Sequence, residues 1–181
     1  EARRLLESAG YVDSDEDGFL DLDGEKLEID LIIPPWGQLP EVGSFLREQW
    51  RTIGIDLVIN PTPGLNSLLN QVDAGNYHLV SFDLFGLDPS LLNSVFATNG
   101  VDNALGYSNE ELDDLLVQAT QEQDSFTRRS LYFQIQSIIM DDALVLPIRD
   151  YVNIVGIRGT ISNLKFDAFG WYPLLYDARL N

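Results

Sequence analysis

The sequence contains no cysteine, and only one histidine and one methionine occur among its 181 residues. Without cysteine the chain cannot form a disulfide, a zinc–thiolate site or iron–sulfur ligation, and it has no catalytic thiol. The single histidine, His78, excludes a histidine-rich metal site, and a Ser-His-Asp triad would depend entirely on it. We interpret His78 as a structural histidine, because no motif links a serine or a carboxylate to it.

Basic residues are also few, since 11 Lys and Arg stand against 29 Asp and Glu and the net charge is −18. Phosphate neutralisation needs clustered Lys and Arg, so we expect no nucleic-acid partner. The same shortage argues against an anionic membrane surface. No apolar run approaches the roughly 18–20 residues of a membrane span. Apolar residues still make up 45% of the chain, which predicts a folded core rather than a disordered polypeptide.

The length of the chain predicts one large domain, or one domain with part of a second. It begins Glu1-Ala2-Arg3-Arg4 without an initiator methionine and shows no signal peptide. We therefore expect a mature form or a piece of a longer protein.

Residues 27–86 follow a β-α-β-α-β pattern. Apolar segments predict strands at 27–33, 55–59 and 79–85, the last of them buried on both faces. Between them, helical stripes begin at Pro40 and Leu65 and end at Gly54 and Gly75. Right-handed crossovers should make the three strands a parallel sheet with flanking helices, which is an α/β fold.

Residues 88–143 are predicted to be helical. The pair Asp88-Pro89 is typical of a helix start, and Ser108 and Ser125 are the expected caps of two further helices. The residues after 159 are rich in aromatic side chains but show no clear period.

In open α/β sheets, ligands bind at the carboxyl ends of the strands. This rule selects the loops 34–38, 60–66 and 85–89, whose candidate ligand-binding residues are Trp36, Phe85, Gly86 and Asp88. Aromatic faces and backbone amides suit an organic solute such as a peptide or a sugar. Two of these residues also have a structural interpretation, because Asp88 is a natural helix cap and Trp36 could cover the core.

The acidic stretch 13–24 has the spacing of a calcium-binding loop. Its oxygen ligands would be Asp13, Asp15, Asp17, the carbonyl of Phe19 and Asp21, with Gly18 allowing the sharp turn. The twelfth position, which should be a bidentate glutamate, is Gly24. The alternative is a solvated turn before a strand, where Asp and Gly are favoured in any case. Calcium is the only cofactor that the sequence suggests, and none is required.

A set of short motifs, in order along nearly the whole chain, resembles the extracellular solute-binding proteins of family 5. These are the oligopeptide-, dipeptide- and nickel-binding components of ABC importers. The matching segments are Ala2-x-x-Leu5-Leu6-x-x-Ala9-Gly10-Tyr11, the turn 13–24, Gln49-Trp50-x-x-Ile53-Gly54-Ile55-x-Leu57, Gly75-x-Tyr77-x-Leu79, Asp88-Pro89, Tyr107-Ser108-Asn109, Arg128-x-x-Leu131-Tyr132-x-x-Ile135-Gln136 and Leu146-Pro147-Ile148.

The resemblance implies one lobe of a two-lobed, periplasmic-binding-protein-like (type II) clamp. Residues 1–146 would form the C-terminal lobe, residues 147–181 would return toward the N-terminal lobe, and that second lobe would be absent from this chain. The implied function is capture of a small solute or peptide outside the cytoplasm, periplasmic or lipid-anchored, and delivery to ABC permease subunits without chemical change. In peptide-binding members an aspartate holds the α-amino group of the peptide, and Phe85 stands at that position here.

Two other functions fit part of the sequence. The acidic loop would also suit a calcium-dependent extracellular interaction module. The many carboxylates would suit a glycoside hydrolase fragment, although no spacing specifies the two converging carboxyl groups that such an enzyme needs.

Overall fold

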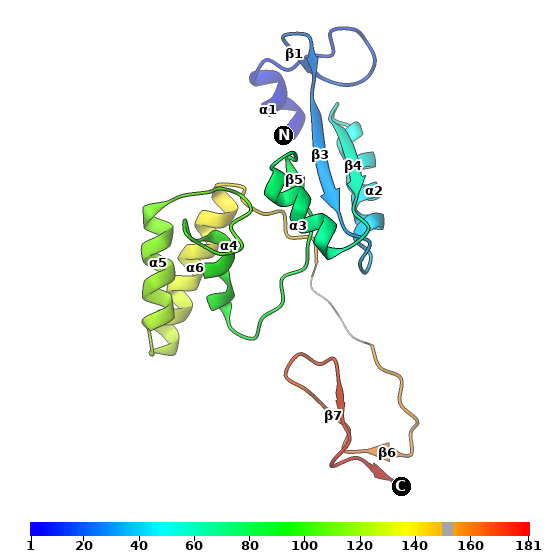
Figure 1. The fold of residues 1–181 in the computed structure, drawn as a ribbon, viewed down its shortest axis with the longest axis vertical. Coiled ribbons are helices and arrows are strands. Elements are labelled where there is room, and N and C mark those ends of the chain that lie inside the picture. The colour runs from blue at the N-terminus through cyan, green and yellow to red at the C-terminus, as the bar shows by residue number, and fades with distance from the viewer. Residues whose placement is uncertain (150–153) are drawn as a thin grey trace. The chain divides into compact units, whose positions relative to one another are not determined.

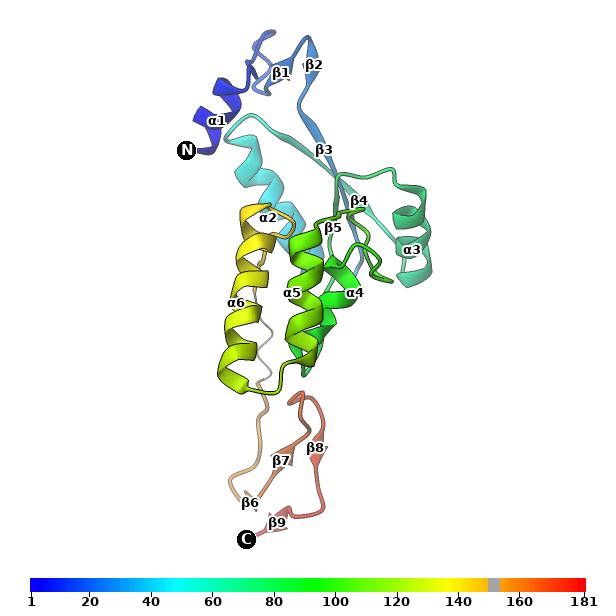
Figure 2. The ribbon, with the colours of Figure 1, turned by 90° about the vertical axis from the view of Figure 1, so that its left-hand side faces the viewer.

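The computed structural model describes residues 1–149 and 154–181 (Figures 1 and 2). The chain divides into two units, residues 1–84 and residues 85–181. Residues 150–153, which fall inside the expected return segment, lie outside the described residues.

The first unit contains three helices and five strands. In chain order they are α1 (Ala2–Ser8), β1 (Asp21–Leu22), β2 (Glu25–Lys26), β3 (Glu28–Ile33), α2 (Leu39–Arg51), β4 (Asp56–Pro61), α3 (Leu65–Ala74) and β5 (Leu79–Val80). The short strands β1 and β2 pair antiparallel and close the acidic loop. The remaining three strands form the sheet that carries the predicted ligand loops.

This sheet has the order β4-β3-β5, and both of its strand pairs are parallel (Figure 1). The central strand β3 pairs with β4 over six residues, from Glu28 opposite Asp56 to Ile33 opposite Pro61. The predicted parallel β-α-β-α-β core is therefore confirmed.

Helix α2 packs on this sheet through its apolar face. Pro40 occupies its first turn, where a missing N–H costs nothing, and Arg51 lies in the last turn, where a cation suits the helix dipole. Leu46 and Trp50 pack against a buried cluster of Leu31, Ile33 and Leu57. This packing fixes the turn between β3 and α2, where Trp36 lies.

The third predicted strand is wrong over most of its length. Only Leu79 and Val80 pair with β3, and one further hydrogen bond joins the Ser81 N–H to the Ile32 carbonyl at 2.9 Å. Because β3 ends at Ile33 and Pro34 follows, the chain beyond Ser81 has no strand edge to pair with. The predicted burial fails there as well, since Phe82, Leu84 and Phe85 are 41–50% exposed.

The second unit contains a short 3₁₀ turn, three helices and four two-residue strands among its described residues. They are η1 (Pro89–Leu91), α4 (Leu92–Phe96), α5 (Glu110–Gln121), α6 (Ser125–Asp141), β6 (Ile161–Ser162), β7 (Lys165–Phe166), β8 (Pro173–Leu174) and β9 (Arg179–Leu180). Helices α5 and α6 lie side by side (Figure 2) and share a core with α4. None of the helices in the described residues is long and apolar enough to span a bilayer.

The caps of α5 and α6 differ by one residue from the predicted ones. Asn109, not Ser108, caps α5 by accepting the Leu112 N–H, and Asp124, not Ser125, caps α6 by accepting the Thr127 N–H. Asparagine and aspartate cap helices at least as well as the neighbouring serines would, and each helix begins directly after its cap.

The C-terminal residues form two small antiparallel pairs, β6 with β9 and β7 with β8. They bury few of their aromatic side chains; Tyr172 and Tyr176, for example, are 68% and 74% exposed. The predicted boundary between residues 146 and 147 stays a prediction.

Candidate functional site

The two loops that follow β3 and β4 adjoin each other, as the carboxyl ends of neighbouring parallel strands should. The N–H of Thr62 donates to the Ile33 carbonyl at 2.9 Å, and the Thr62 residue is only 2% exposed. In the loop after β3, the Leu39 N–H donates to the Trp36 carbonyl at 3.1 Å, which joins the Trp36 turn to the first turn of α2. Trp36 itself is partly buried, so the residue belongs in part to the protein surface.

Phe85 stands at the start of the second unit and is half exposed. Its ring meets Trp171 edge to face, with centroids 4.9 Å apart and planes at 85°. Trp171 in turn lies 5.7 Å from the ring of Phe169. The three rings are 43–50% exposed and form an aromatic cluster that an apolar or stacking solute group can contact. Phe169 and Trp171 were not among the predicted contacts, and the aromatic richness of the tail was the available signal for them.

Gly86 lies against the side chain of Leu91. A Cβ at this glycine would come within 2.2 Å of Leu91 Cδ2. The position therefore has no room for a side chain unless Leu91 moves. Gly86 keeps the backbone of the loop close to η1.

Asp88 has the structural role that its sequence context allowed. Its Oδ1 accepts the Ser90 N–H at 2.8 Å, and Nη2 of Arg128 reaches its two carboxylate oxygens at 2.7 and 2.9 Å. The Arg128 hydrogen bonds, followed by the Ser90 N–H, hold the pKa of Asp88 well below its usual value, so this carboxylate is ionised at neutral pH. Arg128 also donates from Nε to the Ala119 carbonyl at 3.1 Å and thereby ties η1 to α5 and α6.

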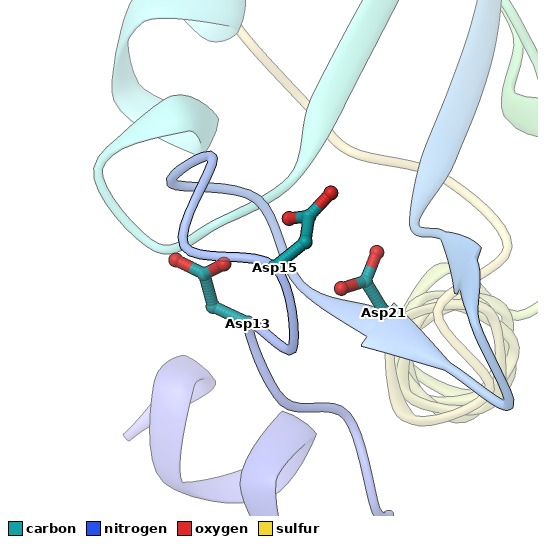
Figure 3. Close-up of side chains that lie close together, drawn as sticks. All are labelled: Asp13, Asp15 and Asp21. Carbon is teal, nitrogen blue, oxygen red and sulfur yellow. The ribbon is translucent and has the colours of Figure 1, made fainter.

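The acidic loop brings three of its four predicted carboxylates together. Ligand oxygens of Asp13, Asp15 and Asp21 lie within 4.8 Å of one another. Figure 3 shows these three side chains gathered in the loop. Asp17 is not in this group; its Oδ1 accepts the Phe19 N–H at 2.8 Å.

The three clustered carboxylates also accept hydrogen bonds from other groups of the loop. Asp13 accepts the Gly18 N–H at 3.1 Å, Asp15 accepts the Asp17 N–H at 3.2 Å, and Asp21 accepts the hydroxyl and N–H of Ser14. The Ser14 hydrogen bonds lower the pKa of Asp21. The loop is thus a self-bonded turn that also gathers hard oxygen ligands of the kind calcium prefers.

His78 has the structural role that the sequence favoured, although its side chain is exposed rather than buried. The Nδ1 atom of His78 accepts the backbone N–H of Asp30 at 2.9 Å. The backbone N–H of His78 donates to the Asp30 carbonyl at 3.1 Å. These two bonds extend the pairing of β3 with the segment that leads into β5.

The four predicted solute contacts fall in different units. Trp36 belongs to the first unit, whereas Phe85, Gly86 and Asp88 belong to the second. Their grouping around one solute stays a prediction.

Comparison with known proteins yields relatives in sequence and in fold, although no family model matches the chain. The oligopeptide-binding protein OppA of Mycobacterium tuberculosis is 24% identical over 182 residues, which cover 98% of this chain and 30% of that protein. The chain thus spans about 30% of the length of the curated relatives that it matches.

Solved structures with the same fold cover between 78% and 99% of the chain. HbpA2 of Haemophilus parasuis has a TM-score of 0.80 at 21% identity and covers 99% of this chain and 35% of its own. AppA of Bacillus subtilis, solved in complex with a nonapeptide, has a TM-score of 0.72 at 20% identity and covers 99% and 37%. NikA of Brucella suis, solved with Fe(III)-EDTA, has a TM-score of 0.65 at 22% identity and covers 78% and 30%. Sequence and fold therefore confirm the predicted resemblance to the family 5 solute-binding proteins, and the chain has the α/β fold of one lobe of this type II class.

Proposed function

We propose that this chain is one lobe of the solute-binding component of an ABC importer, which works outside the cytoplasm and passes its solute to a membrane permease. The observation that carries the proposal is the match of 99% of the chain, its parallel sheet included, to the folds of AppA and HbpA2. Since the relatives are named as binding proteins, we infer that the chain binds its solute without transforming it.

The proposed mechanism is closure of two lobes on the solute. The loop after β3 presents Trp36, and the segment that follows β5 presents Phe85 and Gly86. A solute that contacts both lobes binds the closed arrangement more tightly and so shifts the population toward it. In this proposal residues 1–146 form the lobe and residues 147–181 lead toward its companion. A single lobe offers part of the contact surface and should bind weakly.

The proposed solute is a peptide or another small organic molecule with apolar groups. Named relatives bind oligopeptides, and one is solved with a nonapeptide. Phe85 and its aromatic neighbours offer rings rather than a carboxylate at this part of the surface. The solute therefore gains affinity here from apolar and stacking contacts, and a peptide would need another anchor for its ammonium group.

Trp36→Ala and Phe85→Ala are each expected to weaken solute binding about tenfold or more in the longer protein that contains this chain. Truncating a central aromatic contact commonly costs that much affinity. The measurement is a calorimetric titration with the best ligand from a thermal-shift screen of peptides, sugars and metal chelates. Phe126→Ala is the matched control, because Phe126 is 83% exposed on α6 and belongs to none of the predicted ligand loops.

Three results would contradict this proposal. One is a longer protein without a companion lobe, another is an unchanged affinity in both aromatic variants, and the third is turnover of the bound solute. Turnover that disappears when a carboxylate is changed to its amide would instead favour the glycoside hydrolase alternative.

We also propose that the acidic loop binds Ca²⁺, because the ligand oxygens of Asp13, Asp15 and Asp21 converge within 4.8 Å. Saturating Ca²⁺ is expected to raise the melting temperature by about 2–4 °C, since a ligand that binds only the folded state stabilises it. Asp13→Asn should remove this shift, whereas Asp73→Asn at an exposed position of α3 should keep it. A melting temperature that does not change with Ca²⁺ contradicts calcium binding. A melting temperature that Mg²⁺ shifts equally in Asp13→Asn and Asp73→Asn contradicts it as well.

A further inference from the structure

The guanidinium of Arg128 is held on three sides within the second unit. Its Nη2 atom reaches the two carboxylate oxygens of Asp88, and its Nε atom donates to the Ala119 carbonyl at 3.1 Å. The ring of Tyr132 lies 5.2 Å from it on a third side. A single exposed ion pair stabilises a protein little, partly because both side chains lose freedom when they pair. The contacts with Ala119 and Tyr132 already restrain Arg128, so its bonds to Asp88 can fix the position of a further segment.

The segment fixed in this way is the loop that carries Phe85. Asp88 ends this loop, and Gly86 packs so closely on η1 that a Cβ would have no room. At the start of the loop, the ring of Phe85 meets Trp171 edge to face with centroids 4.9 Å apart. Only two residues separate Phe85 from Asp88, and one of them is pressed against η1. A displacement of Asp88 should therefore move the Phe85 ring relative to Trp171.

We propose that Arg128 is a positioning residue for the solute surface, because through Asp88 it holds the ring of Phe85 in its contact with Trp171. Arg128 itself does not contact the solute in this proposal. The inference rests on the proposed function for the statement that Phe85 contacts the solute, whereas the position of the Phe85 ring can be measured without any solute. The competing explanation is that Asp88 matters only as the cap of η1, through the N–H that it accepts from Ser90.

The test is fluorine NMR of the 181-residue chain labelled with fluorotryptophan, in the absence of solute. The chain has three tryptophans, Trp36, Trp50 and Trp171, and Trp171→Phe identifies the resonance of the last one. A neighbouring aromatic ring shifts the resonance of a fluorine atom through its ring current. Phe85→Leu removes that ring and therefore gives the position of the Trp171 resonance without its neighbour.

Asp88→Asn and Arg128→Met are each expected to move the Trp171 resonance to the position that it has in Phe85→Leu. Asparagine caps a helix as well as aspartate does, so Asp88→Asn keeps the cap of η1 and removes only the ion pair. The double variant should give the same resonance position as either single variant, because both substitutions remove one shared interaction. If Arg128→Met does not fold, Asp88→Asn alone decides, since it leaves the helix core untouched.

Asp124→Asn is the matched control. Asp124 caps α6 by accepting the Thr127 N–H at 2.9 Å and forms no ion pair among the residues that the structure describes, so its substitution should leave the Trp171 resonance unchanged.

Three results would overturn the proposal. They are an unchanged Trp171 resonance in Asp88→Asn, a larger displacement in the double variant than in either single variant, and an equal displacement in Asp124→Asn. A resonance that moves as expected, in a protein whose solute affinity does not respond to Phe85→Ala, would support the positioning by Arg128 and contradict only the proposed solute contact of Phe85.

Discussion

Replacing Ile135 with alanine is expected to lower the free energy of unfolding by about 2–5 kcal/mol. Ile135 lies on the inner face of α6 and is 0% exposed. It belongs to one buried cluster with Leu112, Leu116 and Val95, which come from α5 and α4. The substitution removes three side-chain carbons from a site between α4, α5 and α6. These helices can close the resulting cavity only in part. Chemical denaturation followed by circular dichroism measures the change.

Phe133→Ala is the matched control on the same helix. Phe133 is 73% exposed, so its truncation should change the free energy of unfolding by about 0.5 kcal/mol or less. Equal losses in the two variants would show that both faces of α6 are buried in solution, and the core described for the second unit would then be incomplete. Both variants truncate an apolar side chain to alanine on the same helix, at nearby positions. The main difference between them is the burial of the side chain that is removed.

The inner face of α6 matters for function because the same helix carries Arg128. From α6, Arg128 holds Asp88 and the Ala119 carbonyl, and Asp88 caps η1 directly after the Phe85–Gly86 loop. Loosening α6 therefore removes the support of the loop that presents Phe85. We expect Ile135→Ala to weaken solute binding in the longer protein, although Ile135 itself is not proposed to contact the solute.

The sheet could be predicted from sequence because its signals are local. Apolar runs at 27–33 and 55–59, and helical stripes that end near Gly54 and Gly75, give strands and helices within about three residues of those observed. Gly75 ends α3 with φ of +70°, which glycine adopts at little cost. Parallel pairing then follows from the crossover connections.

The length of β5 could not be predicted, because pairing depends on the partner strand rather than on the paired segment itself. Residues 79–85 have the apolar composition of a strand, yet β3 ends at Ile33 and leaves the second half of this segment without an edge. Amino-acid composition indicates that a segment can form a strand. Where its pairing stops depends on the residues of β3 that lie opposite it.

Contacts around the candidate site were likewise beyond local patterns. Asp88 meets Arg128 forty residues later, and Phe85 meets Trp171 near the end of the chain. The sequence identified Asp88 as a cap, which its context with Pro89 indicates, but no spacing rule connects it to an arginine on another helix. Tyr132 was visible only as part of a family motif, and its burial beneath the Arg128 guanidinium is a property of the packed structure.

Gly43→Val is expected to lower the free energy of unfolding by about 1–3 kcal/mol, because the site is already filled. Gly43 is the one buried residue of α2, and a Cβ there would come within 2.8 Å of Ile33 Cδ1 and 3.6 Å of Leu31 Cδ2. Both side chains are themselves buried in the sheet, at 2% and 4% exposure, so neither has solvent to move into. Valine is a better helix former than glycine, which makes a loss of stability attributable to crowding.

Ser44→Val places the same β-branched side chain one residue further along α2, at an exposed position, and should leave stability within about 0.5 kcal/mol of the parent chain. A Gly43→Val chain that unfolds at the parent's denaturant midpoint would show that α2 does not need this close approach to the sheet.

If Gly43→Val does lose stability, the change should also affect the surface that carries Trp36. α2 begins at Leu39, whose N–H holds the Trp36 carbonyl, so a helix displaced from Ile33 carries the Trp36 turn with it. Weaker solute binding in Gly43→Val, with Ser44→Val unchanged, would therefore connect the packing of the first unit to the position of Trp36.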